Sequence, residues 1–117
     1  MSARGDSLFV RHMRDAIDRM TSYLEGVTKD QYIHDFVLQD AVVRQLEILG
    51  EAAGRVSRET TSAHPEIPWS KVTGMRHRLI HDYFEVDVEL VWATAKERAA
   101  DLRPKVVELL AEMGVSE

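Results

Sequence analysis

Several features that define other classes of protein are missing from this chain. It has no cysteine, which excludes disulfide bonds and thiolate metal sites and fits a reducing cytosol. No apolar run approaches the roughly 18 residues of a membrane-spanning helix, and the segment from Met1 to Asp6 lacks the apolar stretch of a signal peptide. We therefore expect a soluble, cytoplasmic protein with no membrane partner.

Positive charge is also scarce. The 117 residues include 15 lysines and arginines against 20 aspartates and glutamates, which gives a formal net charge of -5. This balance argues against broad, non-specific affinity for nucleic acid, because such affinity depends on counterion release by many basic side chains. Any polyanion must bind at a local basic patch. The remaining composition, 44% hydrophobic and 30% charged, is typical of one globular domain covering residues 1–117.

No β-hairpin signal or internal repeat is evident, and apolar residues recur at helical spacing, so the sequence predicts an all-α fold. A first helix should begin after a cap at Asp6 or Ser7 and break near Gly26. A long second helix should cover residues 35–60, with an apolar arc wide enough for two neighbours. The core-facing positions of the first helix step by three or four residues: Phe9, Met13, Ile17, Met20, Leu24 and Val27.

Prolines and caps place the later helices. Pro68, in a polar connection, suits the first turn of a third helix that runs to about Phe84. Asp87 should cap a fourth helix. Pro104 should either kink that helix or begin a new segment in its first turn, ending before Gly114. The expected architecture is an up-and-down bundle of four main helices with a kinked or split C-terminal helix.

The octapeptide RHRLIHDY, residues 76–83, concentrates two arginines, two histidines and a tyrosine into about two helical turns. Histidine, with an unperturbed pKa of about 6.5, exchanges protons near neutrality, and arginine offers a fixed fork of donors that matches phosphate oxygens. A base and an oxyanion stabiliser together permit phosphate chemistry. A plainer interpretation is a solvated helix face whose basic side chains pair with acids such as Asp82 and Glu85.

Helical geometry limits how this segment can act. On an ideal helix, Arg76 and Tyr83 lie within about 20° of each other, whereas Arg76 and His81 are about 140° apart. Either the helix unwinds near His81, or two copies of the segment meet across a two-fold axis and form one shared cleft. We favour the homodimer. His77 and His81 have the spacing of two metal ligands, but no third ligand completes a site, and we expect neither a metal nor another cofactor.

The pattern R-x-x-x-x-H-x-Y formed by Arg76, His81 and Tyr83 resembles the signature of the HepT-like toxins of the HEPN ribonuclease superfamily. His77 is a departure, because HEPN proteins often carry Asn or Asp after the motif arginine, and this leaves its role open. Four further segments within about residues 35–105 resemble the family in the right order: 49–53 (LGEAA), 65–69 (PEIPW), 74–76 (GMR), and Val86-Asp87 with Val91-Trp92.

The resemblance implies an HEPN-like helical bundle that dimerises with both motifs facing one cleft, and a metal-independent endoribonuclease. His81 would act as base toward a ribose 2′-hydroxyl or as acid toward the leaving 5′-oxygen, and Arg76 would stabilise charge on the phosphorane. Tyr83 would orient the phosphate. It also resembles the tyrosine to which a cognate minimal nucleotidyltransferase antitoxin attaches AMP, so the chain would be the toxin of a toxin-antitoxin pair.

Other residues and functions stay open. Glu51 is a candidate buried partner that fixes Arg76 from the second helix, with a surface glutamate as the alternative. A non-catalytic nucleotide-binding subunit that partners a minimal nucleotidyltransferase would use the same motif without cutting, and a plain helical dimerisation module would ignore it. Scattered charges on helices usually only solvate, but four basic residues could extend a rim for RNA: Arg44, Arg55, Arg58 and Lys71.

Overall fold

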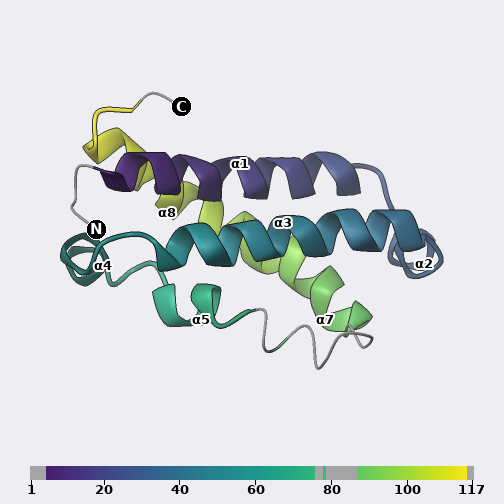
Figure 1. Cartoon of the computed structure of the whole chain (residues 1–117). Coiled ribbons are helices and arrows are strands. Elements are labelled where there is room, and N and C mark those ends of the chain that lie inside the picture. Colours follow the sequence, from purple (N-terminus) through teal and green to yellow (C-terminus); the bar gives the residue numbers. More distant parts are fainter. Residues whose placement is uncertain (1–4, 76–77, 79–86, 116–117) are drawn as a thin grey trace.

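The computed structural model of the chain describes residues 5–75, 78 and 87–115. The regular elements in these ranges are all helices, which confirms the predicted all-α class. Two long antiparallel helices, α1 (Asp6–Leu24) and α3 (Phe36–Gly54), lie side by side, and the C-terminal helices cross behind them (Figure 1). The hydrophobic core lies between these elements.

The N-terminal helix buries the apolar stripe that the sequence predicted. Four of its six predicted positions are at most 1% exposed: Met13, Ile17, Met20 and Leu24. On the facing side of α3, the apolar arc that the sequence predicted is buried at Val42, Leu46, Leu49 and Ala53. Full burial of a large aliphatic side chain contributes about 1.5–3 kcal/mol, so apolar packing dominates the contact between α1 and α3.

The break predicted after the first helix is correct, but the chain forms a further short helix there. This helix, α2 (Lys29–Ile33), begins at a capping box: the Thr28 side chain accepts from the N–H of Gln31, and the Gln31 side chain accepts from the N–H of Thr28. The Tyr32 side chain is fully buried against Trp92, with ring centroids 5.2 Å apart. α2 thereby joins the turn between α1 and α3 to the C-terminal half of the chain.

The second predicted helix is shorter than expected. α3 ends at Gly54 and not near residue 60, because Ser57 begins a separate helix, α4 (Arg58–Ala63). The Ser57 hydroxyl accepts from the N–H of Thr60. The buried carboxylate of Asp6 accepts from the Ser57 N–H and from the hydroxyls of Ser57 and Thr60. The prediction that Asp6 or Ser7 caps the first helix is therefore wrong: Asp6 lies inside α1 and secures the start of α4.

The fourth predicted helix begins where expected. Asp87 caps α7 (Val88–Ala93), because its Oδ1 accepts from the N–H of Leu90 at 3.1 Å. The chain then continues through a π-helical turn, η2 (Thr94–Arg98), into α8 (Ala99–Glu112). Figure 1 shows this arm running from α7 behind α3 to the N-terminal end of α1.

Pro104 does not divide the C-terminal helix at its own position. It lies inside α8, so the new segment that the sequence allowed at Pro104 is not found. Proline cannot donate to the carbonyl of Ala100, but both residues are exposed, so water can satisfy that carbonyl. The helix is instead interrupted earlier, at η2, where the N–H of Ala99 bonds to the carbonyl of Thr94. α8 ends before Gly114, as predicted.

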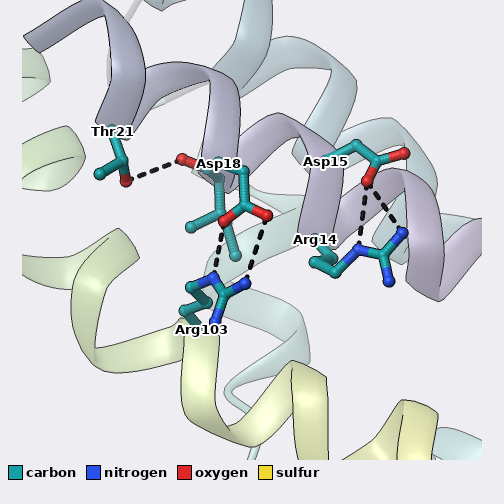
Figure 2. Close-up of polar contacts among 6 residues, drawn as sticks. Arg14, Asp15, Asp18, Thr21 and Arg103 are labelled. Atoms are coloured by element: carbon teal, nitrogen blue, oxygen red, sulfur yellow. Dashed lines mark hydrogen bonds and ion pairs between the residues drawn. The ribbon is translucent and has the colours of Figure 1, made fainter. Parts of the chain in front are cut away.

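An ion pair fastens α8 to α1. The Arg103 guanidinium donates to both oxygens of Asp18, with Nε–Oδ1 and Nη2–Oδ2 distances of 2.6 and 3.3 Å (Figure 2). Both side chains are partly exposed, so the pair contributes little compared with the neighbouring apolar contact. That apolar contact comes from the core face of α8, which buries Val106, Leu109 and Leu110.

The third predicted helix is described mainly at its start. α5 (Trp69–Thr73) packs against α3, with Pro68 at the N-cap and not inside the first turn. A missing N–H is tolerated at the N-cap as it is in the first turn, because neither position has an intrahelical acceptor for it. Beyond α5, the structure describes Met75 and Arg78 as helical, and the other residues of the predicted helix after position 75 lie outside the described ranges.

Candidate active site

The structure describes the elements that lead into and out of the predicted motif. α5 precedes it, and Met75, at 8% exposure, anchors that side in the core. The Asp87 cap of α7 follows it, and Val91 of α7 is fully buried. Four predicted site residues lie outside the described residues, and their placement stays a prediction: Arg76, His77, His81 and Tyr83.

A close contact between α3 and α5 fixes the approach to the motif. A Cβ at Gly50 would lie 3.1 Å from the carbonyl oxygen of Val72, which is tighter than ordinary van der Waals contact. Gly74 is similarly confined, since a Cβ there would lie 3.0 Å from the carbonyl oxygen of Ser70. Glycine at position 50 therefore lets the backbone of α5 approach α3 closely. The segment around Gly50 that resembles the HEPN family has this packing role.

Of the two interpretations of Glu51, a buried partner and a surface glutamate, the exposure of its side chain favours the second. Its side chain is 65% exposed and accepts from Nη2 of Arg55, one turn along α3, at 3.2 Å. Arg55 also lies over the ring of Phe9, 5.9 Å from the ring centroid. The alternative interpretation, a surface glutamate, describes Glu51 correctly. A contact between Glu51 and Arg76 falls outside the described residues and stays a prediction.

A groove of about 240 Å³ opens between α3, α5 and the arm formed by α7, η2 and α8. Its floor is mostly apolar: Leu46, Leu49, Val72, Met75, Leu90 and Leu102. Four cationic side chains, which we call the basic rim, also line it: Lys71, Arg78, Arg98 and Lys105. All four are exposed, and Asp101 is the acidic residue among the groove-lining side chains that the structure describes.

Sequence reasoning missed most of this groove. It named Lys71 as a basic residue for RNA but gave no role to Arg78, Arg98 or Lys105. Arg98 and Lys105 are seven residues apart and therefore share one helix face, a signal that the sequence did contain. The other three residues that were predicted for a basic rim are exposed but do not line the groove: Arg44, Arg55 and Arg58.

Metal ligands and membrane spans can be assessed for the described part of the chain. There, no three His, Cys, Asp or Glu side chains lie together as a set that could hold a metal ion. His77 and His81 are outside these ranges. No helix within the described residues is both long enough and apolar enough to cross a membrane.

Known sequences match most of the chain. The family described as Ribonuclease HepT-like matches residues 13–109, which include the whole motif, and confirms the resemblance. The chain is 36% identical over 101 residues to "Probable ribonuclease HepT" of Thermococcus cleftensis, covering 86% of this chain and 92% of that protein. It is 32% identical over 102 residues to "Putative RNase TTE0752" of Caldanaerobacter subterraneus subsp. tengcongensis, covering 87% and 91% respectively. No solved structure gave a significant match.

Proposed function

Because this chain belongs to the HepT-like ribonuclease family, we propose that it is a metal-independent endoribonuclease and the toxin of a toxin-antitoxin pair. The family makes the chain an RNA endonuclease of the HEPN type. The proposal adds a composite site in a homodimer and control by a cognate nucleotidyltransferase. The observation that carries it is the pattern of Arg76, His81 and Tyr83 inside the residues that match the family.

The motif supplies the two groups that this chemistry needs. His81 accepts the proton of a ribose 2′-hydroxyl as that oxygen attacks phosphorus, or donates a proton to the 5′-oxygen as its bond to phosphorus breaks. Arg76 stabilises the negative charge of the phosphorane through paired hydrogen bonds. The products are a 2′,3′-cyclic phosphate and a 5′-hydroxyl. Because the 2′-oxygen of the RNA is the nucleophile, the reaction needs no metal-bound water.

The composite site follows from the angle between the two groups. A straight helix would separate Arg76 and His81 by about 140°, so one copy cannot aim both at one phosphate. In a two-fold dimer, Arg76 of one protomer acts with His81 of its partner, and the same arrangement repeats across the axis.

Mixing two inactive variants tests this function directly. With excess chelator present, the parent chain should cut RNA and leave 2′,3′-cyclic phosphate ends, whereas Arg76→Ala and His81→Ala alone should each cut at least about 10²-fold more slowly. In a random mixture of the two variants, half of the dimers would be mixed, and each mixed dimer would hold one intact site of two. The mixture should therefore recover about a quarter of the parent rate, measured by gel assay on labelled RNA.

Native mass spectrometry should verify that mixed dimers have formed. If they form and the mixture stays inactive, the composite site is contradicted. If chelator stops the parent chain, metal independence is contradicted. A parent chain that binds RNA but leaves it uncut would favour the alternative, a non-catalytic nucleotide-binding subunit for a minimal nucleotidyltransferase.

Control through Tyr83 gives a second prediction. An adenylyl group on this tyrosine would add a negative charge and the bulk of a nucleotide beside Arg76, because the two positions share a face of an ideal helix. Co-expression with the cognate nucleotidyltransferase should therefore add mass in AMP units to a peptide that contains Tyr83 and should stop RNA cleavage. Tyr83→Phe should escape both effects.

The matched control for this experiment is Tyr23→Phe, which removes a hydroxyl from a partly buried tyrosine of α1. That variant should gain the same mass as the parent chain. Suppressed toxicity with no mass change on the parent would mean that the antitoxin acts by covering the site, and would remove the regulatory role of Tyr83.

A further inference from the structure

The groove between α3, α5 and α8 has the size of a small ligand site. Its volume is about 240 Å³. Pockets for drug-sized ligands span about 300–1,000 Å³, so this groove suits something smaller, such as a single nucleobase with its sugar. The floor is mostly aliphatic and includes the partly exposed Leu90, so it offers a flat base an apolar surface. Shape and polarity thus favour one planar, largely apolar group.

The charge around the groove favours an anion. The chain as a whole carries a formal net charge of -5. Among the described residues that line the groove this balance is reversed, because the basic rim places four cations around it against Asp101. A local basic patch of this kind is what an acidic chain needs in order to bind a polyanion.

Three of the four rim cations have no partner among the described side chains. Within the described residues, no hydrogen bond or ion pair engages the side chains of Lys71, Arg78 or Arg98. Arg103, on α8, differs because it donates to Asp18. A guanidinium can stack on a nucleobase and also donate to phosphate oxygens, so Arg78 and Arg98 suit both parts of a nucleotide.

The backbone of one groove wall is unusual. Thr94 and Arg98, which both line the groove, are the first and last residues of the π-helical turn η2. π-Helical turns are rare and occur frequently at functional sites. The wall that carries Arg98 therefore has a local structure that simple helix packing does not require.

We propose that this groove binds one nucleotide of the RNA strand near the cleaved bond. The base lies on the aliphatic floor and stacks on a rim guanidinium, and the basic rim contacts the adjoining phosphates. The groove lies next to the motif in the chain, because Arg78, which lines it, is two residues from Arg76. This inference rests on the proposed ribonuclease function and adds a substrate-positioning site to it.

A short oligoribonucleotide with 2′-O-methyl groups tests the groove apart from catalysis, since it lacks the 2′-hydroxyl that cleavage requires. Its affinity would be measured by fluorescence anisotropy over a range of salt concentrations. The double variant Lys71→Glu/Arg98→Glu should bind about tenfold more weakly or worse. The slope of the logarithm of affinity against the logarithm of salt concentration should become shallower by about 1.4, since each of the two lost phosphate contacts to a single strand contributes about 0.7.

Arg11→Glu/Arg19→Glu is the matched control. It changes the net charge equally, and both residues are exposed on α1, away from the groove. It should bind within about twofold of the parent, with the parent salt slope. Arg98→Lys keeps the charge but loses the planar group, so it should weaken binding while leaving the salt slope unchanged. Circular dichroism should show parent helicity for every variant.

Three results would overturn the inference. Equal losses in the groove variant and the control would indicate general electrostatics. Parent affinity in the groove variant would exclude the site. A groove variant that becomes monomeric by sedimentation would assign the groove to a second copy of the chain. Parallel cleavage assays separate this inference from the proposed function. If the groove variant cleaves RNA with the KM of the parent chain, only the inference about the groove is contradicted. If the parent chain binds the probe through the groove but does not cleave RNA, only the proposed ribonuclease function is contradicted.

Discussion

His81→Ala should cleave RNA about 10²- to 10⁴-fold more slowly than the parent chain while binding RNA with unchanged affinity. The size of the loss reflects the absence of proton transfer in the transition state. Alanine removes the base but leaves Arg76 and the basic rim to hold the strand. The measurement is single-turnover cleavage together with binding of a 2′-O-methyl oligonucleotide, so that chemistry and affinity are obtained separately.

The pH dependence of the same reaction identifies the role of His81. The parent rate should change steeply near neutrality, where histidine ordinarily titrates, and His81→Ala should lose that part of the profile. His12→Ala is the control, because His12 is exposed on α1 and distant in sequence from the motif. A His81→Ala variant with the parent profile would show that another group transfers the proton.

Arg76→Lys provides an independent check on the same motif. Lysine keeps the positive charge but not the fork of donors that binds two phosphate oxygens, so this variant should also be strongly impaired. Arg19→Lys, an exposed site on α1, should leave the rate unchanged. Near-normal rates for both Arg76→Lys and His81→Ala would reduce the motif to a solvated helix face.

The sequence predicted the parts of the fold that depend on local periodicity. The buried stripe of α1 and the Asp87 cap of α7 each follow from spacing over a few residues, and both are confirmed. The end of α3 was missed, because apolar residues continue past Gly54 to the buried Val56 without a change of period. After α3, Ser57 caps the separate helix α4, and Asp6, 51 residues away, holds Ser57 in place. A local sequence pattern cannot indicate a contact between residues so far apart in the chain.

The same distinction between local and long-range features applies to the candidate site. Arg76, His81 and Tyr83 are close in sequence, so a short local motif was enough to indicate them, and their family is confirmed. The basic rim is assembled from three separate parts of the chain, α5, the helical residue Arg78 and the η2–α8 segment. Along the sequence its residues look like ordinary surface charges. Only the packing of α5 and α8 beside α3 brings them to one groove.

Removing the buried carboxylate of Asp6 should produce the largest loss of stability. Asp6 is 0% exposed, and its oxygens accept from the N–H and hydroxyl of Ser57 and from the hydroxyl of Thr60. Asp6→Ala leaves these donors buried without their charged acceptor, which should cost about 3 kcal/mol. The urea midpoint of unfolding should fall by roughly 1–3 M. Asp40→Ala, an exposed site on α3, should change it little.

The pH dependence of this effect separates the charge of Asp6 from its packing. Burial by itself raises the pKa of Asp6, but the hydrogen bonds from Ser57 and Thr60 outweigh burial and hold the pKa below its ordinary value of 3.8. A carboxyl with a lowered folded-state pKa contributes stability above its unfolded-state pKa and loses that contribution as the pH falls through the folded-state pKa. The free energy difference between the parent chain and Asp6→Asn should therefore be constant near neutrality and shrink below about pH 4. Urea unfolding of both proteins at pH 7 and pH 3 measures this difference, and an equal gap at the two pH values would mean that shape, and not the charge of Asp6, joins α1 to α4.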